Sequence, residues 1–152
     1  MSTHPIRVLA VSSPGGHWIQ LQRLAPAFAG HELIYATVGP CDRSAVAPAP
    51  VHLIPDANAR RPFRMLWLIL RMAWLLLKVR PDVVVTTGAA PGYVAIRIGK
   101  LFGAKTVFLD SIANAEKLSL SARLALAHAD VTLTQWPELA GESGPSYWGG
   151  VV

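Results

Sequence analysis

Short runs of apolar residues alternate along the chain with segments in which apolar positions recur at helical spacing. Residues 7–12 are too short a run for a helix and predict a buried strand. Further strands are predicted at 32–38, 51–54, 82–87, 105–109, 130–134 and, as a short last one, near 147–152. Helices are predicted from Trp18, at about 61–79, from Pro91 to about Phe102 and near 119–128. This alternation predicts a single Rossmann-like α/β domain over residues 1–152, with a parallel sheet and helices on both of its faces.

A glycine-rich turn directly follows the first predicted strand. It reads Ser13-Pro14-Gly15-Gly16-His17 and leads into the helical spacing that begins at Trp18. A strand, a glycine turn and a helix start together present bare backbone N–H groups and a helix N-terminus to an anion, usually a phosphate. Ser13, Gly15 and Gly16 are therefore candidate phosphate-binding residues. A structural turn without a ligand is the alternative.

Four predicted loops leave the carboxyl ends of the strands, where ligands bind in sheets of this type. They lie at 12–17, 86–92, 110–114 and 134–138, and each carries polar residues or glycines. In the second loop, Thr87, Gly88 and Ala89 offer a hydroxyl and backbone N–H groups to a second phosphate or a sugar. Close packing of small residues between strand and helix is the alternative there.

Two side chains at this edge are candidate general bases. His17 is predicted at a helix N-terminus, where the dipole disfavours the imidazolium, so a neutral ring could accept a proton from an attacking hydroxyl. Asp110 closes a strand at the same edge and is the second candidate. Ordinary capping is the alternative for both residues. Trp136, in the last loop, could stack on a sugar or fill an interface, and packing in the core is its alternative.

The segment 61–79 is very apolar but carries cations at a regular interval. Arg64, Arg71 and Lys78 are seven residues apart, so they form one stripe, with Trp67 and Trp74 beside it. No uncharged run exceeds six residues, whereas a spanning helix needs about 20. A helix lying in an anionic membrane interface is therefore predicted. A crossover helix buried between the sheet and a partner is the alternative.

Composition narrows the class of protein. An apolar content of 52% with 15% charged residues excludes disorder. The net charge is +5, and the basic residues cluster around one apolar helix. This arrangement fits binding to a membrane surface better than binding to nucleic acid. A single cysteine, Cys41, excludes a disulfide framework, and no Cys/His cluster has metal-ligand spacing. No bound metal is therefore expected. The first residues carry no signal-peptide pattern, so a cytosolic chain is expected. Neither G-x-G-x-x-G nor a Walker lysine motif occurs.

Several motifs occur in an order that resembles one protein family. These are Ser12-Ser13-Pro14-Gly15-Gly16-His17, Thr86-Thr87-Gly88-Ala89-Ala90-Pro91-Gly92, Ser119-Leu120-Ser121 and Gln135-Trp136-Pro137-Glu138-Leu139. Together they resemble the Alg14-type oligosaccharide biosynthesis proteins, including the bacterial PssD-like exopolysaccharide subunits. Such proteins are similar to the N-terminal, acceptor-binding half of MurG-like glycosyltransferases of the GT-B fold.

The resemblance implies a split enzyme. One chain docks on the cytoplasmic face of the cell membrane and binds a polyprenyl-diphosphate-linked saccharide, while a small second subunit binds most of the UDP-sugar donor. No cofactor of its own and no nucleic-acid partner are expected. By position, Gly15, Gly16 and His17 would face the acceptor diphosphate and the reacting hydroxyl, and Thr87, Gly88 and Ala89 would line the same cleft. Gln135, Trp136 and Glu138 would lie towards the partner.

The expected function is that of a membrane-associated, acceptor-binding subunit of a two-component, inverting glycosyltransferase in polysaccharide biosynthesis. His17 is the first choice for the base and Asp110 the second. The rival interpretation is a stand-alone, soluble α/β enzyme whose Gly15-Gly16 loop holds a nucleotide. The rival predicts that the isolated chain binds nucleotide by itself.

Overall fold

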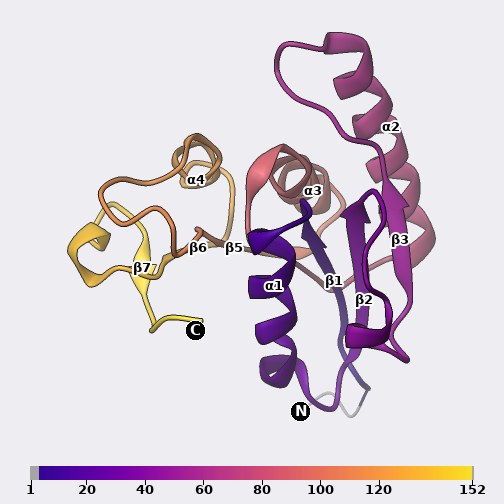
Figure 1. The fold of residues 1–152 in the computed structure, drawn as a ribbon, viewed down its shortest axis with the longest axis horizontal. Helices are drawn as coiled ribbons and strands as arrows, with labels where there is room; N and C mark the ends of the chain where they lie inside the picture. Colours follow the sequence, from indigo (N-terminus) through magenta and orange to yellow (C-terminus); the bar gives the residue numbers. More distant parts are fainter. Residues whose placement is uncertain (1–3, 152) are drawn as a thin grey trace.

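The computed structural model describes residues 4–151, in which a seven-stranded parallel sheet forms the centre of the molecule (Figure 1). The strands lie in the order β3-β2-β1-β4-β5-β6-β7. They are β1 (Arg7–Ser12), β2 (Glu32–Val38), β3 (Val51–Ile54), β4 (Val83–Thr86), β5 (Lys105–Leu109), β6 (Val131–Thr134) and β7 (Ser146–Tyr147). The helices are α1 (Gly16–Arg23), α2 (Pro62–Val79), α3 (Ala89–Leu101) and α4 (Leu120–Ala125), with short 3-10 turns at Ala25–Phe28, Ser44–Val46 and Pro137–Leu139.

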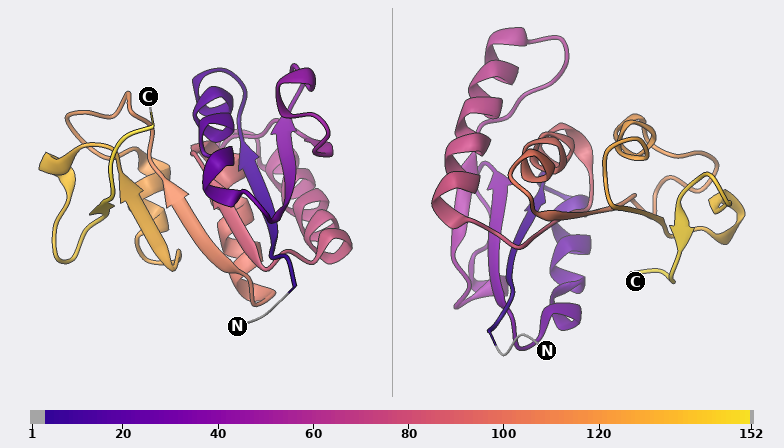
Figure 2. Two further views of the ribbon diagram at one scale, coloured as in Figure 1. Left: turned by 90° about the horizontal axis from the view of Figure 1, so that it is seen from below. Right: turned by 180° about the vertical axis from the view of Figure 1, so that it is seen from behind.

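Helices cover both faces of the sheet, as the sequence predicts (Figure 2). Side chains alternate along β1: Leu9 and Val11 belong to the larger core, which α2, α3 and α4 cover. Val8 and Ala10 belong to the smaller core, together with Trp18 of α1. This alternation is the two-residue period of a strand that is buried on both sides.

The predicted elements are present, with shifts at some of their ends. α3 begins at Ala89 rather than Pro91, because Gly88 (φ +128°) already serves as its N-cap. α4 is shorter than predicted: the Ser119 side chain accepts from Ala122 N at 3.0 Å and caps it, and the helix ends at Ala125. The last strand comes one residue earlier than expected and covers only two residues.

The close packing of α3 on β4 makes a prediction for stability. A Cβ added to Gly92 would lie 2.0 Å from Thr86 Oγ1, so helix and strand would have to separate. We expect Gly92→Ala to lower the free energy of unfolding by about 1–3 kcal/mol, the usual range for overpacking a core. Chemical denaturation measures this change. Gly141→Ala is the control, because a Cβ there meets nothing within 4 Å, and equal midpoints for the two variants would contradict the prediction.

The strand order places one position at the centre of the sheet's carboxyl edge. Going outwards from β1, the chain first builds β2 and β3 on one side and then β4 to β7 on the other. β1 and β4 are hydrogen-bonded neighbours, with Val11 opposite Thr86. The loops that follow these two strands therefore leave the sheet side by side and in opposite directions, which is where parallel sheets bind ligands.

Candidate active site

The turns after β1 and β4 are joined by two reciprocal hydrogen bonds. The His17 ring nitrogen Nδ1 lies 2.8 Å from the carbonyl oxygen of Thr87. The Thr87 hydroxyl in turn donates to the carbonyl oxygen of His17, at 2.7 Å. The structure thus brings together two predicted loops that are 70 residues apart in the chain.

The carbonyl partner orients the imidazole of His17. A carbonyl oxygen can only accept, so Nδ1 carries the proton and Nε2 carries the lone pair. The ring is half-buried at the start of α1. This arrangement suits a group that takes a proton through Nε2 while Nδ1 is held in place.

Both turns present the start of a helix at this edge. Gly15 (φ +79°) is the N-cap of α1 and Gly88 (φ +128°) is the N-cap of α3. The N–H of Gly88 itself donates to Thr86 Oγ1 at 3.1 Å. Because both N-caps are glycines, no N-cap side chain accepts from the N–H groups of either first turn in the described chain, and neither first turn contains an acidic residue. The first N–H groups of each helix are therefore available to an anion, and the helix dipoles favour one.

The remaining predicted residues of these turns lie around the same junction. Gly15 and Gly16 are exposed, whereas Ser13 and Ala89 are half-buried. Ala89, the first residue of α3, has φ +63°, a left-handed value that non-glycine residues seldom adopt. Strain of this kind concentrates at functional sites.

Gly88 leaves room for the histidine ring. A Cβ at this position would lie 3.0 Å from Cε1 and 3.2 Å from Nδ1 of His17. Glycine therefore lets the ring lie against the Thr87 carbonyl without either group having to shift.

Asp110 occupies a different environment from the one expected of a base. Its side chain is only 2% exposed. One carboxylate oxygen accepts from Asn114 Nδ2 at 3.0 Å, and the other accepts from Ser119 N at 2.9 Å. These bonds close the loop between β5 and α4, and they do not support the role of second base.

The three residues expected to face a partner differ in burial: Gln135 is buried, Trp136 is half-buried and Glu138 is exposed. Gln135 is 5% exposed, and its amide nitrogen donates to the carbonyl oxygen of Asp110 at 3.0 Å. The indole of Trp136 donates to Ile112 O at 2.7 Å, so its nitrogen fixes the same loop. Glu138 alone among the three predicted partner residues is exposed. Gln135 therefore lies inside the protein, where it holds the loop after β5, and the position of its own loop, 135–138, towards a partner stays a prediction.

Gln20 is a connecting residue that sequence reasoning missed. Its carbonyl oxygen accepts from Gln135 Nε2 at 2.6 Å and from Ile112 N at 3.2 Å. Its amide nitrogen donates to the Ser111 hydroxyl at 3.1 Å. The sequence offered one signal for this role: Gln20 is a polar residue among apolar residues of the same helix, three residues after His17. Gln20 joins the helix that carries His17 to the loops after β5 and β6.

The long helix α2 has one buried and one exposed apolar face. Leu68, Met72, Leu75, Leu76 and Val79 pack on the sheet. The opposite side exposes apolar side chains, including Phe63, Leu66, Trp67, Leu70, Trp74 and Leu77. The packed face agrees with the crossover interpretation of this segment, and the exposed apolar face leaves the interfacial interpretation as a prediction.

Two of the three cations of α2 lie against one tryptophan, Trp74. The guanidinium carbon of Arg71 lies 4.4 Å from the Trp74 ring centroid, and Lys78 Nζ lies 5.0 Å from it. Arg64 is exposed one turn before Trp67, nearer the start of the helix. Burial, together with the positive charges of Lys78 and Arg71, lowers the pKa of His52 on the neighbouring strand β3. Within residues 4–151, no helix is both long and apolar enough to cross a membrane.

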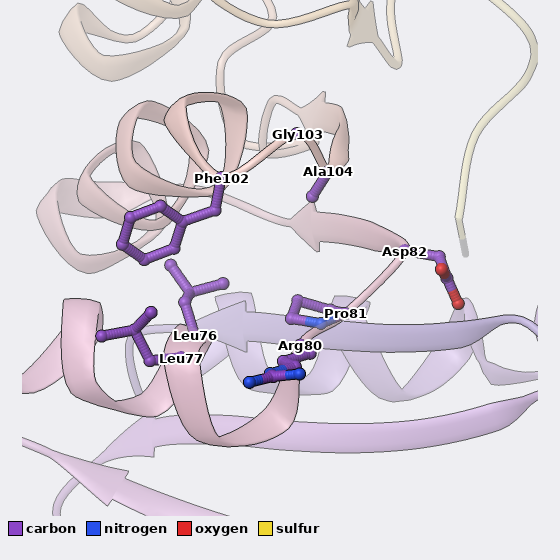
Figure 3. Close-up of a pocket in the computed structure, with 8 residues that line it drawn as sticks. All are labelled: Leu76, Leu77, Arg80, Pro81, Asp82, Phe102, Gly103 and Ala104. Atoms are coloured by element: carbon purple, nitrogen blue, oxygen red, sulfur yellow. The ribbon is translucent and has the colours of Figure 1, made fainter.

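A cavity of about 540 Å³ lies at the opposite edge of the sheet, between the end of α2 and the turn after α3 (Figure 3). Leu76, Phe102 and Ala104 are among its lining residues. Asp82 also lines the cavity, but its carboxylate accepts a hydrogen bond from Arg7 N at 2.8 Å and so has a structural role. Among residues 4–151, no three His, Cys, Asp or Glu side chains gather to hold a metal ion. The candidate site is therefore the junction of the two glycine turns.

Comparison with solved structures confirms the predicted fold. A crystal structure of MurG from Acinetobacter baumannii superposes with a TM-score of 0.77 at 14% identity, covering 94% of this chain and 45% of that one. A UDP-N-acetylglucosamine 2-epimerase from Rickettsia bellii superposes with a TM-score of 0.67 at 15% identity, covering 89% of this chain and 40% of that one. At these identities the likeness establishes the fold, which is that of one half of a GT-B protein.

Sequence comparison establishes the family. The UDP-N-acetylglucosamine transferase subunit ALG14 of Eremothecium gossypii is 35% identical over 88 residues, which are 54% of this chain and 39% of that protein. This chain therefore matches about two fifths of the length of that relative. The model of the family described as "Oligosaccharide biosynthesis protein Alg14 like" matches residues 54–152, more than half of the chain. The chain belongs to the Alg14-like family of oligosaccharide biosynthesis proteins.

Proposed function

We propose that this protein is the acceptor-binding subunit of a two-component glycosyltransferase. The observation that carries the proposal is the junction of two uncapped helix N-termini with an oriented histidine. This junction offers an anion site and a proton acceptor within one short span, as a diphosphate-linked acceptor with a reacting hydroxyl requires. Family membership and the name of the fungal relative support the assignment to glycosyl transfer.

The proposed reaction moves a sugar from a UDP-sugar to a hydroxyl of a polyprenyl-diphosphate-linked saccharide, in polysaccharide biosynthesis. The backbone N–H groups after Gly15 and Gly88 hold the acceptor diphosphate. His17 Nε2 takes the proton of the acceptor hydroxyl as its oxygen attacks the anomeric carbon. The bond to the UDP oxygen breaks on the opposite face, UDP leaves with the electron pair, and the configuration at that carbon inverts.

The donor is proposed to bind mainly to a separate subunit. This chain superposes on 45% of the MurG chain, and in this proposal a second subunit supplies the other half of the GT-B site. The cleft between the two subunits would then hold the UDP-sugar opposite His17. In this proposal the chain itself needs no cofactor.

The protein is proposed to dock on the cytoplasmic face of the cell membrane through the exposed side of α2. Phe63, Trp67 and Trp74 are 88%, 59% and 47% exposed, which is unusual for large apolar side chains on one helix. Arg64 and Lys78 are exposed on the same helix, and Trp74 lies against the charges of Arg71 and Lys78. Tryptophan beside cations suits the headgroup level of an anionic bilayer.

Removing the three cations of α2 tests this docking. We expect the triple variant Arg64→Gln, Arg71→Gln and Lys78→Gln to bind phosphatidylglycerol-containing vesicles about 100-fold more weakly, because each cation contributes about 1 kcal/mol. Cosedimentation with vesicles measures the change. The matched control replaces the exposed cations Arg23, Arg43 and Lys117, which lie outside α2. An equal loss for both triple variants would mean that only net charge matters.

The central proposal is tested by rebuilding the enzyme. The tagged chain is purified from detergent-solubilised native membranes, and the proteins that come with it are identified. Co-purification of a small α/β protein with a nucleotide-sugar site, and sugar transfer that needs both chains, is the expected result. A partnerless chain that binds UDP-sugar by itself would instead establish the stand-alone nucleotide-binding enzyme.

A further inference from the structure

An apolar groove of about 500 Å³ lies on the helical side of the sheet that carries α2, α3 and α4. In Figure 1, α3 lies between α2 and α4. The lining residues of α3 are Ala90, Tyr93, Val94, Arg97 and Ile98, and they follow the helical spacing of a single stripe. The other walls are formed by Ala59 before α2, Met65 and Ile69 of α2, and Leu120, Ser121 and Leu124 of α4.

The groove begins beside the candidate site. Ala90 lies two residues after Gly88, in the first turn of α3. From Ala90 to Ile98 the stripe runs about 12 Å along the helix axis. A molecule whose anionic end sits at the N-terminus of α3 could therefore extend directly into the groove.

The lining is suited to one apolar chain. Leu120 and Leu124 are 64% and 45% exposed, so apolar surface remains uncovered there. Arg97 is the only charged residue of the lining, and its Nη1 donates to the Tyr93 hydroxyl at 3.1 Å and to His128 Nε2 at 3.2 Å. Its charge is thus held near the end of the groove that is farthest from Gly88. The volume falls in the range of small-molecule sites.

We propose that this groove binds the first isoprene units of the acceptor's lipid chain, an inference that rests on the proposed function. The chain would leave the diphosphate at the N-terminus of α3 and lie along α3 between α2 and α4. The groove and the outer face of α2 then have different roles. The groove holds a single lipid chain, and the outer face of α2 contacts the bilayer. Continuity with the anion site and an apolar lining free of carboxylates favour this occupant over a protein segment.

Geranyl diphosphate and inorganic diphosphate are the two probes. Isothermal titration calorimetry measures the affinity of the full chain for each of them. The geranyl compound should bind at least about tenfold more tightly, because its chain is withdrawn from water. Leu124→Glu places a charge in the groove and should abolish this gain while leaving inorganic diphosphate binding unchanged. Leu120→Glu serves as a second groove variant. Leu101→Glu is the matched control, because Leu101 is 79% exposed on the same layer but outside the groove. Melting curves confirm that each variant folds.

The outcomes separate this inference from the proposed function. Equal affinity for both probes would overturn the groove's role and leave the anion site intact. Failure of both probes to bind would overturn the anion site and the groove together. If Leu124→Glu keeps the geranyl gain but loses capture of the donor-binding subunit, the groove is a protein interface and the inference is wrong. Loss of the gain in Leu101→Glu as well would also overturn it.

Discussion

Replacing His17 by alanine should lower the rate of sugar transfer by the assembled enzyme about 10²- to 10⁴-fold, the usual contribution of a general base. The Thr87 carbonyl fixes the proton on Nδ1, so Nε2 is the atom that can accept a proton from the acceptor hydroxyl. Alanine removes this acceptor, and it leaves the helix N-termini that are proposed to hold the diphosphate. We therefore expect the fall mainly in kcat, measured by steady-state transfer with both subunits present.

His17→Asn distinguishes a base from a structural residue. An asparagine amide can still donate to the Thr87 carbonyl, but it cannot take up a proton at neutral pH. If His17 is the base, asparagine should be as inactive as alanine. His31→Ala is the control, because His31 is exposed and accepts from Ile6 N at the opposite edge of the sheet. Turnover near that of the wild type in His17→Asn would assign the histidine to loop bracing alone.

Gly88→Ala should lower transfer by about tenfold, although Gly88 itself contributes no side chain to the proposed reaction. The added Cβ would lie 3.0 Å from Cε1 of His17, so the ring must move away from the Thr87 carbonyl. The required shift is a few tenths of an ångström. It is smaller than the misplacement of about 1 Å that costs about 10²-fold, so a loss of about tenfold is expected. The substitution also strains the backbone, since φ is +128° at this position.

Gly103→Ala separates strain from displacement. Gly103 also has a positive φ, +84°, but a Cβ there meets nothing within 4 Å. Both variants should lose about 1–3 kcal/mol of folding free energy, measured by chemical denaturation, because each forces alanine into a conformation that favours glycine. Only Gly88→Ala should lose the corresponding activity. Comparable losses of transfer in both variants would show that reduced stability, rather than the position of His17, explains the effect.

The sequence was sufficient to predict the fold and to place two glycine turns at one edge of the sheet. Strands such as 7–12 are short apolar runs, and glycine turns follow two of them. The residues within each short segment are therefore enough to predict the elements and the turns that connect them. The pairing of His17 with Thr87 could be anticipated only in outline. It depends on the register of β1 against β4, which no single segment contains.

The roles of the polar loop residues could not be predicted in the same way. Asp110 and Gln135 follow strands and precede loops, so they have the sequence setting of ligand-binding residues. Whether such a side chain faces a cleft or the interior depends on groups from distant segments. Ser119 N and Gln20 Oε1 satisfy them here, and both partners are neutral groups that leave no charge pattern in the sequence.

The main-chain carbonyl that orients His17 has a consequence for how the candidate site can diverge. Because the acceptor of the Nδ1 bond is backbone, a new side chain at position 87 removes only the reciprocal hydroxyl bond. A new side chain at position 88 displaces the ring itself. The orientation of the His17 ring, the proposed base, is thus fixed by the backbone path at Thr87 and not by the side chain at that position. Mutations in the surrounding loops can therefore explore other acceptor sugars while the proton-accepting geometry is retained.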